Sequence, residues 1–250
     1  MSKAIILVAF GSAHIDGIKN SILLLEEEYK NRFNNEYLVI TAFTSKRVIQ
    51  LLKERYNVYI PHLTEVLFKL ANNGYDDVIV QPLHMISGRG YEEVKKTIDE
   101  YRYSFKTLVL KQGLLFSDKD ISKLVNELAD SIKKGPILLA GHGSKSDSNE
   151  VYYKIQSILD SKLDSRVYLA TIDGEATIED AIKEMHKDRI SEVTIEFLFI
   201  IPGKHIVDDI CYGNNSWKAR IEKAGIKVNL SKTSLLQQMG IRKIFTDKLD

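Results

Sequence analysis

The feature of this 250-residue chain that most constrains its fold is a regular alternation of short apolar runs with longer amphipathic stretches. The apolar runs are rich in Val, Ile and Leu and are too short for buried helices, so we expect strands. Continuous apolar strands separated by helices are typical of parallel sheets with both faces covered. The predicted strands are 4–10, 38–43, 77–83, 107–110, 136–140, 167–171 and 192–200, with 226–230 as a further candidate.

The stretches between the strands have the periodicity of helices. One of them starts at Pro61 and is followed by Gly74, and this is the usual punctuation of a helix. The final stretch is expected to pack back on the first half of the chain. The predicted helical stretches are 18–33, 61–74, 117–134, 149–163 and 233–249.

The two halves of the chain resemble each other, which indicates a duplication. Three segments align in the same order: 5–13 (IILVAFGSA) with 137–145 (ILLAGHGSK), 38–46 with 167–175, and 78–90 with 193–205. We therefore expect two similar α/β lobes joined near Gly113, with residues 1–113 in the first lobe and 114–250 in the second.

The halves differ where the aligned strands end. The first half has an aromatic ring, a cation and a glycine there, and the second has two imidazoles and a carboxylate: Phe10, Lys46 and Gly90 against His142, Glu175 and His205. The carboxyl ends of parallel strands share one edge of the sheet, and ligands bind at that edge. A set of two histidines and a carboxylate suits a divalent ion with open coordination positions.

Each of these three residues also has a plainer interpretation. His142 lies in a Gly-His-Gly-Ser turn that could bind phosphate through its backbone alone. Glu175 could be a solvated charge at a helix start, where it would complement the helix dipole. His205, after a Pro-Gly turn, could be a helix-entry residue. The functional interpretation rests on the three residues together.

Composition excludes several classes of protein. A net charge of +1 gives no reason to expect nucleic acid or a membrane surface as a partner. The single cysteine, Cys211, excludes an internal disulfide. The apolar run before Gly11 is too short for a secretory or membrane segment, so we expect a cytoplasmic protein. Nucleotide-binding glycine loops, the nucleophile elbow of hydrolases and the His-Glu-x-x-His zinc motif are absent from the sequence.

A loop of the first lobe, 81-QPLHMISGRGYEE-93, offers polar side chains at the corresponding edge. We interpret His84 as a substrate contact, with Arg89, Tyr91 and Glu92 beside it. The other histidines, at positions 14, 62 and 186, rank lower because they follow the first-lobe turn or lie within helical patterns.

These motifs carry a resemblance over the whole chain. The sequence resembles the anaerobic sirohydrochlorin cobaltochelatases of the class II chelatase family, which also includes the ferrochelatases. The matching segments are AIILVAFGSA, QPLHMISGRGYEEV, the Gly-His-Gly-Ser turn, the Asp-Gly-Glu of 173–175, and 202-PGKHIVDDICYGNNSWK-218. The last two and His142 are the specific part of the match, because the strand patterns alone fit many α/β proteins.

The resemblance implies two flavodoxin-like lobes, each a parallel sheet flanked by helices, facing a central cleft. It implies that His142, Glu175 and His205 hold Co²⁺ as a substrate metal, that His142 accepts protons, and that no organic cofactor is needed. The tetrapyrrole substrate, sirohydrochlorin, is a polycarboxylate, so loop cations are candidate contacts. These candidates are Lys46, Arg47, Arg89, Lys145 and Lys204.

Several alternatives stay open at this point. The same side chains fit a ferrochelatase or a nickel- or iron-specific sirohydrochlorin chelatase, because nitrogen and oxygen ligands do not select cobalt. A carrier of tetrapyrrole or metal would bind without turnover. A zinc hydrolase is disfavoured because the sequence offers no separate general base. A homo-oligomer is also left open, since the family includes short homodimeric relatives.

Overall fold

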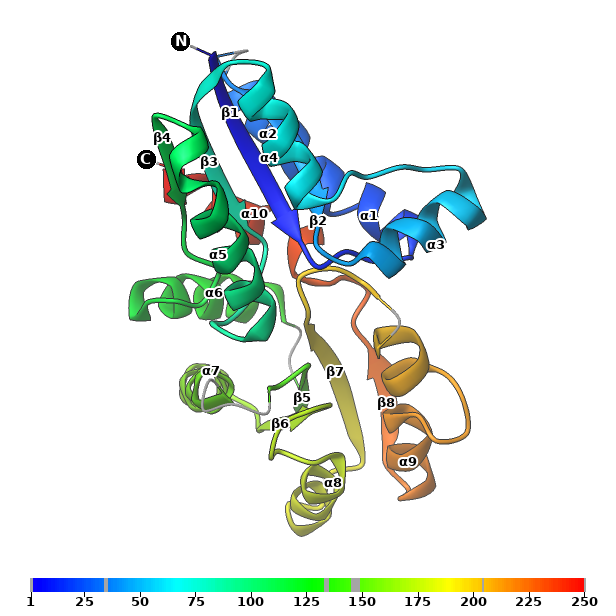
Figure 1. The fold of residues 1–250 in the computed structure, drawn as a ribbon. Helices are drawn as coiled ribbons and strands as arrows, with labels where there is room; N and C mark the ends of the chain where they lie inside the picture. Colours follow the sequence, from blue (N-terminus) through cyan, green and yellow to red (C-terminus); the bar gives the residue numbers. More distant parts are fainter. Residues whose placement is uncertain (1, 34–35, 133–134, 145–148, 204, 250) are drawn as a thin grey trace. The chain divides into compact units, whose positions relative to one another are not determined.

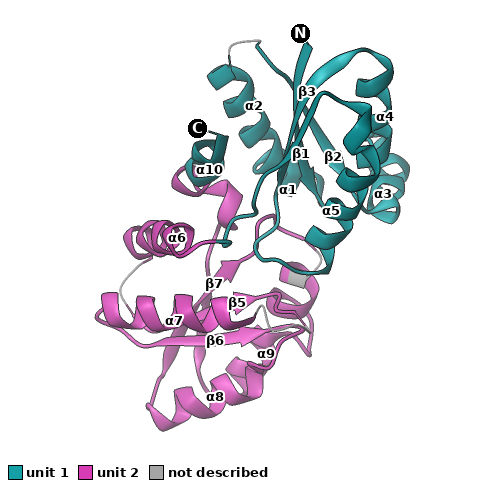
Figure 2. Ribbon diagram, turned by 60° about the vertical axis from the view of Figure 1, so that its left-hand side comes forward, with its two compact units in different colours: residues 1–116, 242–250 teal, residues 117–241 magenta. Residues whose placement is uncertain are grey.

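The chain forms two compact units (Figure 2), which we call unit 1 and unit 2. Unit 1 comprises Met1–Phe116 and Arg242–Asp250, and unit 2 comprises Ser117–Ile241. The sequence had placed the division at 113/114. The computed structural model describes residues 2–33, 36–132, 135–144, 149–203 and 205–249, with His205 described by its backbone alone.

Unit 1 is built on a four-stranded parallel sheet in the order β2-β1-β3-β4 (Figure 1). Its strands are β1 (Ser2–Ala9), β2 (Leu38–Phe43), β3 (Tyr75–Pro82) and β4 (Thr107–Leu110). Its helices are α1 (Ile15–Lys19), α2 (Ile22–Phe33), α3 (Lys46–Tyr56), α4 (Leu63–Asn72), α5 (Arg89–Tyr101) and the short η1 (Arg102–Ser104).

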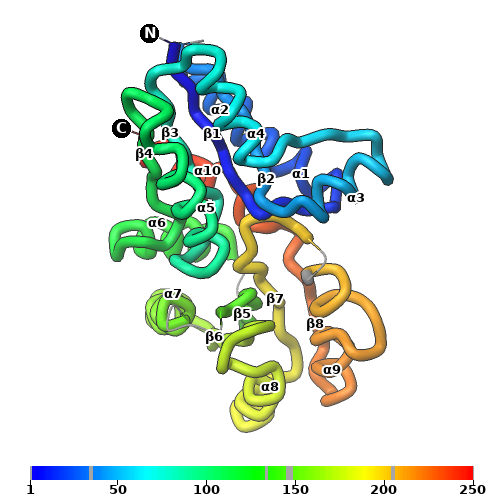
Figure 3. The backbone as a smooth tube through the Cα atoms, viewed as in Figure 1, coloured from blue at the N-terminus to red at the C-terminus, as the bar shows by residue number. Residues whose placement is uncertain are grey.

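Unit 2 repeats this plan with the strand order β6-β5-β7-β8. Its strands are β5 (Ile137–Gly141), β6 (Val167–Thr171), β7 (Glu192–Leu198) and β8 (Lys227–Leu230). Its helices are α6 (Asp118–Ser131), α7 (Glu150–Lys162), α8 (Ile178–Lys187), η3 (His205–Cys211), α9 (Trp217–Lys223) and η4 (Leu235–Gln237). The chain then returns to unit 1 within α10 (Met239–Thr246) and ends at η5 (Asp247–Leu249), as the tube in Figure 3 shows.

The predicted fold class is confirmed, since every predicted strand is present and each parallel sheet is flanked by helices. Two helical stretches differ from the prediction: 233–249 is divided among η4, α10 and η5, and 18–33 is divided between α1 and α2 at Asn20 and Ser21. Asn and Ser favour caps and turns over helix interiors, and the Ser21 hydroxyl donates to the Gly17 carbonyl. Within the described ranges, no helix is long and apolar enough to cross a membrane.

Helices cover both faces of each sheet, as continuous apolar strands require. In unit 1, α4 and α5 bury Ile6 and Val8 on one face of the sheet. Helix α2 lies on the opposite face, where the Glu26 carboxylate accepts a hydrogen bond from the Thr41 hydroxyl. In unit 2, α8, η3 and α9 pack against Leu138 and Ala140. Each fully buried Leu or Ile contributes about 2 kcal/mol to stability. The sheets are therefore rigid platforms for the loops at their edges.

The end of the chain is anchored in unit 1 by polar contacts as well as apolar ones. The buried Tyr29 hydroxyl donates to the Phe245 carbonyl at 2.9 Å, and burial raises the pKa of Tyr29. The largely buried Arg242 donates through Nε to Glu28 Oε1 at 2.7 Å. The last turn of the chain thus contributes to the core of unit 1.

The strand register shows which residues of the two units correspond. Ile5 lies opposite Val39 and Ile79, and its counterpart Ile137 lies opposite Val167 and Thr194. The alignment of 78–90 with 193–205 therefore holds. The alignment of 38–46 with 167–175 is off by one residue, because Val39 corresponds to Val167. As a result, the unit 1 counterpart of Glu175 is Arg47, and that of Asp173 is Ser45.

The order of the strands fixes where a ligand can enter each unit. From β5 the chain crosses to β6 on one side and later to β7 on the other, so the loops leaving β5 and β7 diverge. Such a switch point at the carboxyl ends of the strands is where open α/β sheets bind ligands. In unit 2 it is flanked by His142, just after β5, and by His205, a few residues after β7.

Candidate active site

The loop that carries His142 leaves the sheet in a conformation that requires glycine. Strand β5 is buried along its whole length, and the chain turns at Gly143, which has a φ of +73°. A Cβ at Gly143 would lie 2.6 Å from the Gly174 backbone nitrogen and 2.8 Å from Thr171 Cβ. Only glycine fits this position. The loops after β5 and β6 therefore approach each other backbone to backbone.

The His142 ring is half exposed and has defined neighbours. Its Nδ1 lies 3.3 Å from the Gly143 carbonyl oxygen and 3.7 Å from Asp173 Oδ2. Phe199 packs edge-on against the ring at a centroid distance of 6.3 Å. A carbonyl oxygen only accepts, so this contact favours the tautomer with the proton on Nδ1. The lone pair of that tautomer is on Nε2.

Asp173, and not Glu175, is the carboxylate next to His142. The Asp173 backbone N–H also donates to the His142 carbonyl at 2.8 Å, which joins the two loops directly. Glu175 lies between β6 and α8 with an exposed side chain. For Glu175, the described part of the chain records no hydrogen bond or ion pair. Sequence analysis passed over Asp173, although it lies in the Asp-Gly-Glu segment that carried the resemblance.

The third predicted metal ligand, His205, begins the π-helix η3. The Tyr212 N–H donates to the Val207 carbonyl at 2.9 Å, which is the five-residue spacing of a π-helix. Such helices are rare in proteins, and those that occur are often at functional sites. The His205 side chain and the whole of Lys204 and Lys145 lie outside the described residues. Among the side chains that are described, no three His, Cys, Asp or Glu residues are grouped to hold a metal ion.

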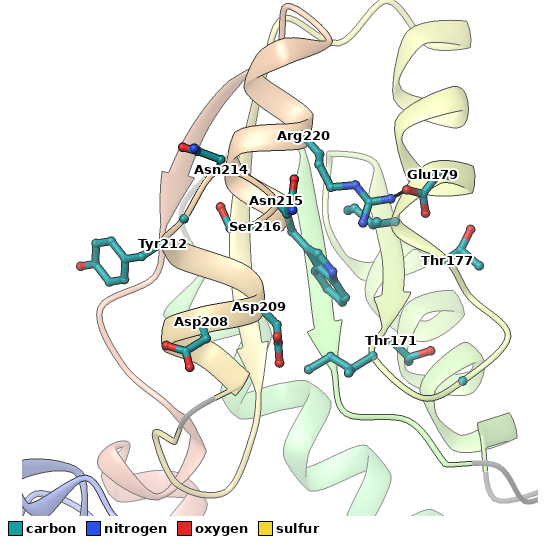
Figure 4. Close-up of a pocket in the computed structure, with 15 residues that line it drawn as sticks. Thr171, Thr177, Glu179, Asp208, Asp209, Tyr212, Asn214, Asn215, Ser216 and Arg220 are labelled. Atoms are coloured by element: carbon teal, nitrogen blue, oxygen red, sulfur yellow. Dashed lines mark ion pairs between the residues drawn. The ribbon is translucent and has the colours of Figure 1, made fainter.

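A pocket of about 590 Å³ lies beside this site in unit 2 (Figure 4). The loop after β6 contributes Thr171 and Gly174 to its lining, and η3 contributes Asp208 and Asp209. The buried Trp217 forms a wall. At its far side, Arg220 and Glu179 form an ion pair, which Figure 4 shows as a dashed line. The pocket carries more acidic than basic side chains, so it does not favour a polycarboxylate.

In unit 1, the predicted substrate contact His84 lies just after β3 and is partly exposed, with both ring nitrogens buried. Neither ring nitrogen has a hydrogen-bond partner within the described residues. Burial lowers the pKa of His84 to about 4, so the ring is neutral at neutral pH. Tyr91 packs edge-on against it at 6.5 Å, and Phe116 lies 4.7 Å from the Tyr91 ring. Burial also raises the pKa of Tyr91.

The charged residues predicted for substrate binding in unit 1 are exposed. Arg89 starts α5, has 94% of its side chain exposed, and lies 3.3 Å from Glu93 through Nε. Glu92 is exposed in the same turn. Lys46 is exposed at the start of α3, after the cap residue Ser45. The structure thus brings His84 and Tyr91 together, whereas Lys46 belongs to a different loop.

The fold, with an imidazole beside a carboxylate at the switch point of unit 2, fits the class of α/β metal chelatases. The chain belongs to the cobalt chelatase (CbiK) family, whose model matches residues 3–250.

Relatives of known name agree with this assignment. The chain is 26% identical to a sirohydrochlorin cobaltochelatase of Salmonella typhimurium, over all of this chain and 96% of the relative. It is 24% identical to the sirohydrochlorin cobaltochelatase CbiKC of Nitratidesulfovibrio vulgaris, over 90% of this chain and 81% of the relative. The solved structure of SirB from Bacillus subtilis with Fe³⁺ has the same fold, with a TM-score of 0.68 at 15% identity over 100% of this chain and 94% of that one.

Proposed function

We propose that this protein inserts Co²⁺ into sirohydrochlorin and that His142 is the central residue of the reaction. The observation that carries the proposal is the pairing of His142 with Asp173 at the switch point of unit 2. Family membership and the names of the relatives support the choice of metal and macrocycle. The place of such a reaction is cobalamin biosynthesis.

His142 has two uses in the reaction, one after the other. Metal insertion requires two pyrrole protons to leave the macrocycle while the divalent ion enters. With Nδ1–H directed to the Gly143 carbonyl, the Nε2 lone pair can ligate Co²⁺ or accept a proton. The Asp173 carboxylate, 3.7 Å from Nδ1, stabilises the positive charge that the ring gains when it accepts a proton. The macrocycle's own affinity for the metal drives the exchange.

A carboxylate and His205 complete the proposed ligand set. A set of two imidazoles and one carboxylate leaves coordination positions open, so the macrocycle nitrogens can replace the protein ligands. Glu175 was the carboxylate predicted from the sequence, whereas the carboxylate that lies beside His142 is Asp173, 3.7 Å from Nδ1. The two assignments differ in which variant loses activity.

Unit 1 supplies the proposed contacts to the rest of the macrocycle. The neutral His84 and Tyr91 offer an aromatic, weakly polar surface, and Arg89 and Lys46 offer cations for the substrate's carboxylates. Lys204, which belongs to unit 2, is a further proposed cation contact. Glu92 would repel a carboxylate, so its proposed contact is with a pyrrole N–H or a bound cation.

A spectroscopic assay tests the function directly. The purified protein is mixed anaerobically with Co²⁺ and excess sirohydrochlorin, and the absorbance of the macrocycle is followed. We expect many turnovers per protein molecule, and faster insertion with Co²⁺ than with Fe²⁺ or Ni²⁺. Binding of one equivalent without turnover would instead identify a carrier. Turnover of protoporphyrin in preference to sirohydrochlorin would identify a ferrochelatase.

A pair of variants tests which carboxylate serves His142. Asp173→Asn should lower kcat by about 100-fold, because removal of a general acid–base partner or a ligand costs about that much. Glu175→Gln should lower it less than about threefold. Glu184→Gln, on the exposed part of α8, is the matched control and should have no effect. The opposite ranking of Asp173 and Glu175 would make Glu175 the carboxylate on which the reaction depends.

A further inference from the structure

The loop that presents His142 is held by two side chains from the start of α7. The loop leaves the sheet at Gly141 and turns at Gly143, so at these two positions it has no side chain of its own to hold it in place. Tyr152 supports it where it leaves β5, and Asn149 holds it two residues after His142. Neither residue belongs to the ligand set proposed above.

Asn149 binds both backbone groups of a single loop residue. Its Oδ1 accepts the Ser144 N–H at 2.7 Å, and its Nδ2 donates to the Ser144 carbonyl. The side-chain amide therefore makes the two hydrogen bonds that a neighbouring β-strand would make with the Ser144 backbone. An amide is the group suited to this task, because it carries a donor and an acceptor side by side.

The Asn149 side chain is not used to cap its own helix. Asn149 occupies the N-cap position of α7, where Asn normally accepts a backbone N–H of the first turn. No such hydrogen bond is present here. The amide is directed to the His142 loop instead, and the φ and ψ of Asn149, −71° and −20°, are helical and not the extended values of a capping residue.

The same amide lies where the two loops of the site meet. A Cβ at Gly174 would lie 3.3 Å from Asn149 Oδ1, so this oxygen is packed against the loop that carries Asp173. Gly143 contacts the Gly174 backbone from the other side, and the Asp173 N–H donates to the His142 carbonyl. Asn149 thus contacts the first loop through Ser144 and the second through Gly174.

The second side chain that holds the loop is Tyr152, which packs against Gly141 at the end of β5. A Cβ at Gly141 would lie 2.6 Å from the Tyr152 ring, so the loop rests on this buried side chain. Its hydroxyl is hydrogen-bonded to the Gly143 backbone, and burial raises the pKa of Tyr152 to about 12. The phenol is therefore neutral at neutral pH.

We propose that Asn149 is a positioning residue for the reaction, which fixes His142 against Asp173 by clamping the Ser144 backbone, with Tyr152 as its support. This inference rests on the proposed function, because it assigns Asn149 to the same site. Loss of the clamp lets the loop shift while the sheet beneath it stays folded. A misplacement of about 1 Å at a reacting group can cost 100-fold in rate.

The first test compares kinetic constants for the wild type, Asn149→Ala and Asn149→Asp. We expect Asn149→Ala to lower kcat by about 10- to 100-fold with KM for sirohydrochlorin changed less than about twofold. Asn149→Asp keeps the acceptor for the Ser144 N–H but loses the donor, so it should fall between Asn149→Ala and the wild type. Tyr152→Phe, which keeps the ring and loses the hydroxyl, should lower kcat by about threefold.

A second measurement separates this inference from the proposed function. The binding of Co²⁺ alone is titrated by its visible absorption, which needs no tetrapyrrole and no turnover. We expect Asn149→Ala to weaken Co²⁺ binding by about tenfold. If the wild type turns over no substrate, the proposed function fails, and the Co²⁺ titration still tests the clamp.

The control is Asn229→Ala, in the same unit. Asn229 is exposed on β8 and donates to Glu192, at the amino end of β7, away from the strand ends that carry the site. It should leave kcat and Co²⁺ binding unchanged. The proposal is overturned if Asn149→Ala keeps both quantities within about twofold of the wild type. It is also overturned if activity falls only in proportion to the unfolded fraction measured by circular dichroism, since that result defines a purely structural role.

Discussion

The two units share a strand order and a register, but the positions of one histidine and one phenylalanine are swapped between them. After the first strand of each unit stand Phe10 and His142, and after the third stand His84 and Phe199. The register of β1 with β3, and of β5 with β7, places each pair at corresponding positions. Both units therefore carry one histidine and one phenylalanine at the switch point, on opposite strands.

The exchange shows that the surroundings of an imidazole decide its use. His142 has 43% of its side chain exposed, and its Nδ1 has a carbonyl and a carboxylate nearby. The ring nitrogens of His84 are covered and have no partner among the described residues, and its pKa is lowered to about 4. A metal ion or a proton can reach the first ring. The second is held neutral by burial, which makes it a packing and contact residue.

The glycines that follow the exchanged residues also differ in what they permit. Gly11 and Gly143 both have positive φ, +107° and +73°. A Cβ at Gly11 would meet the Phe43 ring, whereas one at Gly143 would meet the Gly174 backbone. In unit 1 an aromatic side chain fills the space beside the loop. In unit 2 two glycine backbones touch, and this contact leaves room for Asp173 and His142 to face each other.

The largest difference between the units is expected in the rate of cobalt insertion when alanine replaces His142 in unit 2 or its counterpart in unit 1. His142→Ala should lower the rate of cobalt insertion by about 1,000-fold, because it removes both a ligand and a proton acceptor. Phe10→Ala, its counterpart in unit 1, should change the rate by less than about fivefold. Steady-state kinetics with Co²⁺ and sirohydrochlorin measures both, and tetrapyrrole binding by His142→Ala should remain measurable. Equal losses in the two variants would contradict the assignment of the chemistry to unit 2.

The pH dependence of stability should reveal the buried imidazole of unit 1. The folded-state pKa of His84, about 4, lies below the unfolded value of about 6.5. The unfolded chain therefore binds more protons between these values, and stability is full above pH 6.5 and falls as the pH drops toward 4. The loss amounts to about 3 kcal/mol. Urea unfolding of the wild type and of His84→Phe, over this pH range, measures it.

His84→Phe places in unit 1 the residue that unit 2 carries at Phe199. It should remove this part of the pH dependence, and it should not destabilise the protein at pH 7, because an apolar ring of similar shape replaces unpaired polar atoms. His186→Ala, at an exposed position of α8, is the control and should keep the wild-type slope. An unchanged slope in His84→Phe would show that His84 is solvated or paired in solution.

The strands and the duplication could be predicted from the sequence, and His142 could be singled out as a candidate, because these signals are local. Apolar runs of strand length are visible without knowledge of the partners they pair with, and a histidine between two glycines at a strand end is visible in one segment. The contact of Asp173 with His142 was not anticipated, because it joins two loops that are far apart in the sequence and meet only in the folded unit.

The burial of His84 and the clamp by Asn149 could not be foreseen for a different reason. Both depend on side chains brought together by tertiary packing, such as Tyr91 with Phe116, and Asn149 with the Ser144 backbone. In the sequence Asn149 is the first residue of the predicted helical stretch 149–163, and only the structure shows that its amide binds the Ser144 backbone. Local patterns thus predict elements, whereas contacts between loops require the fold.

The backbone contact of unit 2 can be tested through its glycine. Gly143→Ala should lower the free energy of unfolding by about 2 kcal/mol, since alanine at this φ is strained and its Cβ meets backbone that cannot move aside. Gly225→Ala is the matched control, because its φ of +82° is similar and nothing lies within 4 Å of the added Cβ. It should cost about 1 kcal/mol. Equal losses in the two variants would mean that the Gly143–Gly174 contact contributes nothing to stability.

The smallest effect is expected at the most exposed predicted contact, Arg89. Its side chain is 94% exposed, and among the residues that the structure describes its one ion pair is with Glu93, which is too weak to fix it in advance of substrate. Arg89→Ala should therefore raise KM for sirohydrochlorin by about threefold and leave kcat unchanged, with a smaller difference at high salt. Arg102→Ala, beyond the other end of α5, should leave both constants unchanged. If Arg89→Ala lowers kcat as well, this residue acts on the reacting macrocycle, and unit 1 takes a larger part in the chemistry than its buried histidine indicates.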